Sequence, residues 1–193
     1  MNQKIRFIIY GLVGVFILIT YFLKEPNIKN DLPISGLVPD FEFTDSNGQI
    51  ITREDMKGKV WVADFIFTTC TMACPIMTGN MNIIHKTFKD NNNVRIISIS
   101  VYPEYDTPAI LKEYASRYNA NTDRWHFLTG PEESVKKIIK NGFKIGDYED
   151  IIFHSEKFAL VDINGNIRGY YSGMKTEDMS LLQKDIKRLL TEI

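Results

Sequence analysis

The sequence predicts an α/β fold with a central mixed sheet, preceded by an apolar N-terminal segment. Strand-like apolar runs alternate with helical stretches, which predicts parallel strand pairs with helices on both faces of the sheet. Two Asn-Gly pairs between short extended runs add hairpins. The 193 residues, 44% hydrophobic and 24% charged, fit one globular domain with a short extension and exclude a disordered chain or a multidomain enzyme. The balance of 23 Lys and Arg against 24 Asp and Glu argues against a nucleic-acid partner.

The N-terminal segment has the features of a membrane anchor. Residues 7–23 are 17 uncharged residues that follow Lys4 and Arg6, at the short end of what spans a bilayer as a helix. We interpret residues 1–24 as a transmembrane anchor. The alternative is a cleaved signal peptide, but the apolar run is long for one and no small-residue cleavage site follows. In both cases the positive-inside bias places the remaining chain on the extracytoplasmic side, in the periplasm or at the cell exterior.

A polar tether is expected to separate the anchor from the folded domain. Residues 25–38 contain Pro, Asn, Ser and Gly without hydrophobic periodicity. The domain is therefore expected over residues 39–193. It opens with a hairpin, because Asn47-Gly48 tolerates positive φ and separates two short extended runs. These runs are residues 41–44 and 49–52.

Strands and helices alternate after the first hairpin. Thr107-Pro108 has the form of an N-cap followed by a first helical residue, and Gly142 is a candidate C-cap. Asn164-Gly165 predicts a second hairpin. In chain order, the expected elements are strand 59–67, a helix from about residue 75, strand 94–101, helix 107–118, strand 125–128, helix 130–141, hairpin strands 158–163 and 167–171, and a helix from 176 to 190.

The two cysteines lie four residues apart, directly after the strand 59–67. Sites in such sheets form at the carboxyl ends of the strands. On a helical turn, Cys70 and Cys74 would share a face with Cβ atoms about 5–6 Å apart, which permits either a disulfide or joint binding of one ion. A nearby helix N-terminus favours the thiolate. A structural disulfide is the alternative, but closing so short a loop removes little unfolded-state entropy, and a domain of this size does not need one.

Several motifs around this pair occur in a characteristic order. They are Phe67–Pro75 (FTTCTMACP), Ser98–Pro108 (SISVYPEYDTP), Phe127–Gly130 (FLTG), and His154 ahead of Leu160–Gly165 (LVDING). Together they resemble the Sco/SenC family, and the resemblance runs from about residue 36 to the end of the chain. One departure is Tyr102, where the family usually has Asp before Pro103.

The resemblance implies a thioredoxin-like, three-layer fold that is anchored to a membrane and binds one copper ion, Cu(I) or Cu(II). The ligands that it implies are Cys70, Cys74 and His154. The family assists copper delivery to, or thiol reduction at, the binuclear copper site of cytochrome c oxidase. The implied partners are therefore the copper-site subunit of that oxidase and a copper donor protein or thiol reductant.

The chemistry of the implied ligands favours copper. Two thiolates and an imidazole form a soft set of three donors, short of the four usual for structural zinc, and copper leads the Irving–Williams order. Thioredoxin-like folds place a cis-proline opposite the cysteines, and this chain has no proline after Pro131. The resemblance places His154-Ser155 at roughly that position.

The other soft or titratable side chains have simpler interpretations. We expect His85 on a solvated helix face and His126 within a strand, each with a structural role. Met72 could lend a thioether to copper, but a loop Met more often packs against the rim of a site. Met77 and Met81 fall on the core face of the predicted helix.

The leading hypothesis is a copper metallochaperone in which oxidation of Cys70 and Cys74 to a disulfide releases the ion. It does not require the protein to be an enzyme. The alternative is an exported thiol–disulfide oxidoreductase with the same cysteines as its redox pair, although CxxxC in place of CxxC argues against general thioredoxin activity. A peroxidase is disfavoured, because Cys70 lacks a Pro-x-x-x-Thr-x-x-Cys loop.

Overall fold

The computed structural model describes residues 32–146 and 156–193. The predicted anchor, residues 1–24, lies outside the described residues. Within the described part of the chain, no helix is both long and apolar enough to cross a bilayer. Residues Leu32–Ile193 belong to one folded unit.

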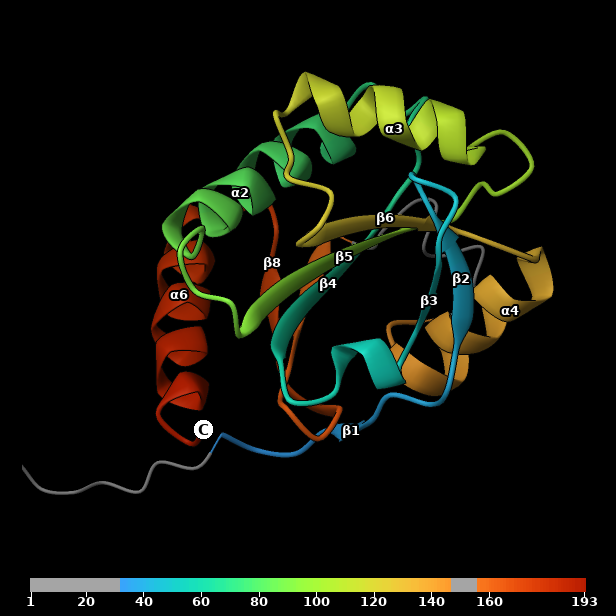
Figure 1. The fold of residues 1–193 in the computed structure, drawn as a ribbon. Helices are drawn as coiled ribbons and strands as arrows, with labels where there is room; N and C mark the ends of the chain where they lie inside the picture. Colours follow the sequence, from blue (N-terminus) through green and yellow to red (C-terminus); the bar gives the residue numbers. More distant parts are fainter. Residues whose placement is uncertain (1–31, 147–155) are drawn as a thin grey trace, which may run out of the picture. The chain divides into compact units, whose positions relative to one another are not determined.

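An eight-stranded mixed sheet forms the centre of the described residues (Figure 1). The strands are β1 (Gly36–Leu37), β2 (Glu42–Asp45), β3 (Ile50–Thr52), β4 (Val60–Ile66), β5 (Val94–Ser100), β6 (Trp125–Thr129), β7 (Lys157–Val161) and β8 (Asn166–Ser172). Their order is β1-β8-β7-β4-β5-β6-β2-β3. The β4–β5 and β5–β6 pairs are parallel and the other pairs are antiparallel, so the predicted mixed sheet is confirmed.

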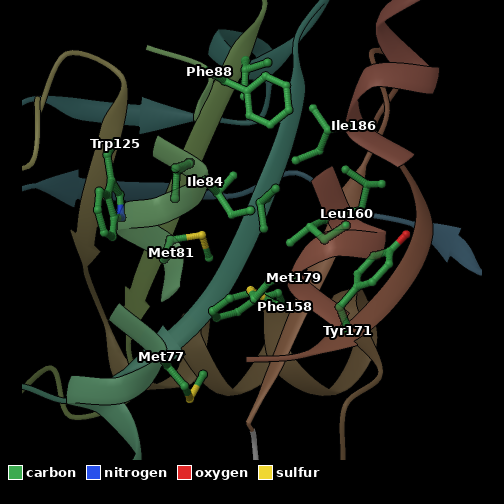
Figure 2. Close-up of a cluster of buried hydrophobic side chains, with 14 of the residues drawn as sticks. Met77, Met81, Ile84, Phe88, Trp125, Phe158, Leu160, Tyr171, Met179 and Ile186 are labelled. Carbon is green, nitrogen blue, oxygen red and sulfur yellow. The ribbon is translucent and has the colours of Figure 1, made fainter. Parts of the chain in front are cut away.

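Helices cover both faces of this sheet. They are α2 (Ala73–Thr87), α3 (Pro108–Arg117), α4 (Glu132–Lys137), α6 (Thr176–Leu190), the 3₁₀-helix η1 (Glu54–Met56) and the π-helix η2 (Ile138–Phe143). Helices α2, α3 and α6 pack against one face, where Met77, Met81 and Trp125 are buried among aliphatic and aromatic side chains (Figure 2). Helices α4 and η2 pack against the other face. The core is therefore divided by the sheet into two layers, and Met77 and Met81 lie in it as predicted.

Both predicted hairpins are confirmed, and both use the same turn chemistry. In each turn, an aspartate Oδ1 accepts the backbone N–H groups two and four residues later, at 2.8–2.9 Å from Asp45 and 2.9 Å from Asp162. The glycines Gly48 and Gly165 have φ of 79° and 84°, a conformation that costs glycine little. These aspartates reinforce the Asn-Gly signal that predicted the turns.

The folded unit begins earlier than the sequence predicts. The tether was expected to extend to residue 38, but β1 pairs with β8, and Val38 is fully buried. The carbonyl of Leu32 accepts hydrogen bonds from Nε and Nη2 of the buried Arg168 at 3.0 and 2.7 Å. These contacts join residues more than 100 positions apart in the chain, so a local sequence pattern cannot predict them.

Gly142 is not the C-cap that the sequence predicts. The helical segment continues through η2, and Lys144 adopts the left-handed conformation with φ of 53°. Gly142 is buried, and a Cβ at this position would lie 2.8 Å from Pro39 Cδ and 3.2 Å from Ile138 Cγ1. Its role is therefore to permit close packing against Pro39.

This contact predicts opposite outcomes for two glycine substitutions. Gly142→Ala is expected to lower the free energy of unfolding by about 1–3 kcal/mol, because the added methyl group overpacks the contact with Pro39. A Cβ at Gly79, inside α2, would meet no atom within 4 Å beyond the backbone of its own helix, so Gly79→Ala is expected to stabilise by about 0.5–1 kcal/mol. Urea unfolding of the two variants measures both effects. Equal destabilisation of both would contradict the packing role of Gly142.

Candidate metal and thiol site

Cys70 and Cys74 lie together at the carboxyl end of β4. Cys70 closes a turn in which its N–H donates to the Phe67 carbonyl at 3.1 Å. Cys74 is the second residue of α2, and its N–H donates to Cys70 Sγ at 3.4 Å. Helix α2 begins at Ala73, before the predicted start near Pro75, so the pair spans the junction between turn and helix. Both cysteines are free.

The N-terminus of α2 directs its unpaired amides towards Cys70. The N-cap residue, Met72, makes no side-chain capping hydrogen bond. The first amides of a helix lack intrahelical partners and favour negative charge. The Cys70 sulfur therefore accepts a bond that a capping side chain would otherwise accept, and it sits where a thiolate is stabilised.

The local environment lowers the pKa of Cys70 below its usual value. Partial burial alone would raise this pKa, but hydrogen bonds from the N–H groups of Cys74 and Met72 outweigh burial. Hydrogen bonding with the Cys74 thiol acts in the same direction. Cys70 is partly exposed, so the cysteine whose thiolate form is favoured is also one that solutes can reach.

Cys74 has the opposite character. Its side chain is 5% exposed and packs in the core layer beneath α2. Burial raises its pKa to about 12, and the hydrogen bond to Cys70 and the negative charges of Cys70 and Asp64 act in the same direction. The pair therefore combines an accessible cysteine with a lowered pKa and a buried cysteine with a raised pKa, the arrangement of an attacking and a resolving cysteine.

This asymmetry predicts selective alkylation. When the reduced protein reacts with iodoacetamide at pH 7, we expect label on Cys70 well before Cys74, because the thiolate is the nucleophile and Cys74 is buried and protonated. Mass spectrometry of the peptide that contains both cysteines measures the order, and unfolded protein serves as the control in which both react. Equal labelling of the two folded cysteines would contradict the asymmetry.

Asp64 lies within β4 and is fully buried, six residues before Cys70. Its Oδ1 accepts the Ser98 hydroxyl at 2.5 Å, and Ser98 Oγ in turn accepts Trp125 Nε1 at 2.9 Å. Its Oδ2 has no hydrogen-bond partner among the described residues. Burial raises the pKa of Asp64 to about 7. An acidic residue within an apolar strand is unusual, and this feature of the sequence could have singled out Asp64.

Exposed apolar and aromatic side chains occur in the loops that follow β4 and β5. Met72 is 78% exposed, so the prediction that it packs against the rim of the site is wrong. Tyr102 and Tyr105, from the loop after β5, stack with ring centroids 5.9 Å apart and are both exposed. The buried Asp106 of the same loop binds Thr68, in the turn that carries Cys70. The sequence pattern predicted only the helix that begins at Thr107-Pro108, and it gave no sign of this contact of the preceding Asp106.

The structure describes two of the three histidines, His85 and His126. His154, the predicted third ligand, lies outside the described residues. His85 is half-buried and packs on Trp125 with ring centroids 5.5 Å apart, so the predicted solvated face is wrong, and its structural role stays a prediction. His126 is buried in β6 beside Asp45, with Nδ1 and Oδ2 3.6 Å apart. Within the described residues, no group of three or more His, Cys, Asp or Glu side chains could hold a metal ion.

Comparison with known proteins identifies the family. A family model described as SCO1/SenC matches residues 32–191. The chain belongs to the SCO1/SenC family. The SCO1 protein homolog of Bacillus subtilis (strain 168) is 38% identical over 165 residues, which cover 82% of this chain and 86% of that protein.

Solved structures of the family resemble this one over most of their length. BsSco, described as a member of the Sco family of cytochrome c oxidase assembly proteins with a disulfide switch, matches with a TM-score of 0.73 and 36% identity over 82% of this chain and 96% of that chain. ScoI of Bradyrhizobium japonicum with copper bound matches with a TM-score of 0.66 and 28% identity over 79% and 99%. The mixed α/β sheet is consistent with the thioredoxin-like fold of the Sco proteins.

Proposed function

We propose that this protein is a copper metallochaperone that binds one copper ion through Cys70, Cys74 and His154 and passes it on for assembly of cytochrome c oxidase. The observation that carries the proposal is the pair of free sulfurs at the N-terminus of α2, one favoured as a thiolate and within reach of solvent. The relatives support it, because one is described as an oxidase assembly protein and another holds copper.

The donor chemistry of the described residues fits copper. Thiolates are soft ligands, which Cu(I) prefers, and the two cysteines are neighbours, with the Cys74 N–H 3.4 Å from Cys70 Sγ. Cys74 must lose its proton to bind, so binding releases a proton and weakens as the pH falls. His154 would add a neutral imidazole and complete a set of three.

The same pair offers a means of release. Loss of two electrons from the two thiolates to an external oxidant joins the sulfurs in a disulfide. Neither sulfur then remains a thiolate, so the ion loses two of its three ligands. The short separation across the junction between the cysteine turn and α2, with the Cys74 N–H donating to Cys70 Sγ, favours closure of this bond.

The proposal includes the location of the protein. Residues 1–24 would act as a membrane anchor, since residues 7–23 carry no charge and basic residues precede them. Lys4 and Arg6 would stay in the cytoplasm, and the folded unit would face the extracytoplasmic side. The partner there would be the copper-site subunit of the oxidase, with a copper donor protein or thiol reductant acting before it.

An anaerobic Cu(I) titration of the reduced full chain against a competing chelator tests the ligand set. We expect one ion per chain, and His154→Ala should weaken binding, whereas His85→Ala, which removes a histidine packed on Trp125, should not. Unchanged affinity in His154→Ala would remove this residue from the ligand set. Absence of stoichiometric binding in the unaltered protein would refute the copper function.

A thiol–disulfide oxidoreductase is the second candidate, favoured by the asymmetry between Cys70 and Cys74. In that role, Cys70 attacks a disulfide of the target protein and Cys74 resolves the mixed disulfide, which leaves the target reduced and this protein oxidised. Exchange with a peptide that carries the two cysteines of an oxidase copper site distinguishes the candidates. Rapid exchange together with weak copper affinity would favour the oxidoreductase.

A further inference from the structure

The carboxylate of Asp106 connects two loops at the carboxyl end of the sheet. Asp106 is fully buried. Its Oδ1 accepts the Thr68 hydroxyl at 2.5 Å, and its Oδ2 accepts the Thr68 N–H at 3.1 Å and the Ser100 hydroxyl at 2.6 Å. Thr68 belongs to the loop after β4 and Ser100 ends β5, so one side chain joins the ends of two parallel strands.

Thr68 is part of the turn that positions Cys70. This turn runs from Phe67 to Cys70 and is closed by the bond from the Cys70 N–H to the Phe67 carbonyl. Asp106 accepts hydrogen bonds from both donors of the second residue of the turn, the N–H and the hydroxyl of Thr68. The carboxylate therefore fixes the orientation of the backbone that leads directly into Cys70.

Asp106 is itself held in place from the other side. Its N–H donates to the Tyr102 carbonyl at 2.9 Å, and the Ser100 hydroxyl that binds its carboxylate accepts the Tyr102 N–H at 3.0 Å. The cap of α3 is supplied separately, because Thr107 Oγ1 accepts the Ile110 N–H. Two of the three hydrogen bonds of the Asp106 carboxylate thus go to the cysteine turn and the third goes to Ser100, while the neighbouring Thr107 caps the helix.

We propose that Asp106 is a positioning residue for the thiol pair and acts through Thr68. The inference rests on the proposed function, in which Cys70 and Cys74 form the working site. Groups that orient metal ligands through hydrogen bonds commonly change metal affinity by 10–100-fold when they are removed. Asp106 sets the position of Cys70, whereas Cys74 is fixed independently by its helix, so loss of the contact with Thr68 changes the relation between the two sulfurs.

Three variants separate this role from a general effect on stability. Thr68→Val keeps the shape of the side chain and removes only the hydroxyl that binds Asp106, and Thr68→Ser restores that hydroxyl. Thr107→Ala is the matched control, because it removes the α3 cap one residue from Asp106 and no hydrogen bond to the cysteine turn. Substitution of the buried Asp106 itself is avoided, since it would leave the two hydroxyl donors without an acceptor.

The first readout needs no copper. Amide hydrogen exchange in the reduced full chain should be about tenfold faster over residues 67–74 in Thr68→Val, a factor that corresponds to loss of about one hydrogen bond. Thr68→Ser should behave as the unaltered protein does. Thr107→Ala should lower the melting temperature and leave exchange over residues 67–74 unchanged.

The second readout is the absorption of the Cu(II)-loaded protein. Thr68→Val should shift the sulfur-to-copper band and weaken copper binding by about tenfold, and Thr68→Ser should restore both. Unchanged exchange and an unchanged band in Thr68→Val would overturn the proposal, even if the variant melts earlier. If the unaltered protein binds no copper, the proposed function fails, and hydrogen exchange still decides whether Asp106 positions the turn.

Discussion

Replacement of Cys70 by serine is expected to reduce copper affinity by more than about 100-fold, since loss of a ligand exceeds the 10–100-fold cost of losing a group that merely orients one. The fold should survive, because Cys70 is partly exposed and lies outside the helix. The measurement is a competition titration with Cu(I), combined with circular dichroism to confirm folding. Copper affinity within a few-fold of the unaltered protein would exclude Cys70 as a ligand.

Met72 provides the matched control for this substitution. It lies in the same loop, is 78% exposed and carries a soft thioether sulfur two residues from Cys70. Met72→Leu keeps the size and apolar character of the side chain, so we expect little change in copper affinity. A loss as large as that of Cys70→Ser would instead make Met72 a ligand.

Asp64→Asn is expected to change how stability depends on pH. Burial raises the pKa of Asp64 from 3.8 to about 7. Between these values the folded protein holds a proton that the unfolded chain has lost, so the free energy of unfolding falls as the pH rises. The contribution of this one group is about 4 kcal/mol, fully lost above the folded pKa. The variant should lack this contribution.

Urea unfolding of the reduced protein from pH 4 to pH 8 measures this effect as the difference between variant and unaltered protein. The difference removes the contributions of His85 and His126, whose lowered pKa values act in the opposite direction. Asp64→Asn should gain stability relative to the unaltered protein above pH 7 and show little gain near pH 4. Asp40→Asn, at an exposed aspartate, is the control. Parallel pH profiles for Asp64→Asn and the unaltered protein would contradict the prediction.

Asp64 also connects stability to the thiol pair. Its negative charge contributes to the high pKa of Cys74, so an uncharged asparagine should make Cys74 easier to deprotonate. The same Asp64 charge therefore lowers the stability of the fold and helps to keep the Cys74 thiol protonated. This residue is a place where the strand departs from an apolar core pattern at a cost in stability, as proteins do near functional sites.

Features with local causes were predictable from the sequence. The two hairpins follow from the Asn-Gly pairs and the aspartates before them, and Thr107-Pro108 begins α3 as expected. The position of the cysteines at the end of a buried strand follows from the apolar run before them. In each case the residues that form the structure are within a few positions of one another, so the local sequence is sufficient to predict it.

Features that depend on distant residues were not predictable. Gly142 has the local signature of a C-cap, but its role is set by contact with Pro39, about 100 residues earlier. Asp106 lies before a helix cap, and only the fold brings it to Thr68. The predicted start of the domain was wrong because β1 forms only by pairing with β8, which lies far along the chain. The third ligand, His154, stays a prediction.

The central claim is that Cys70 and Cys74 act as one site with two states, a reduced state that binds copper and a disulfide state that does not. The most direct test compares the absorption spectra of reduced and disulfide-linked full chain, each given one equivalent of Cu(II) without oxygen. The account predicts a sulfur-to-copper charge-transfer band in the reduced protein and none in the disulfide form. A reduced protein without this band, or a disulfide form that retains it, would contradict the account.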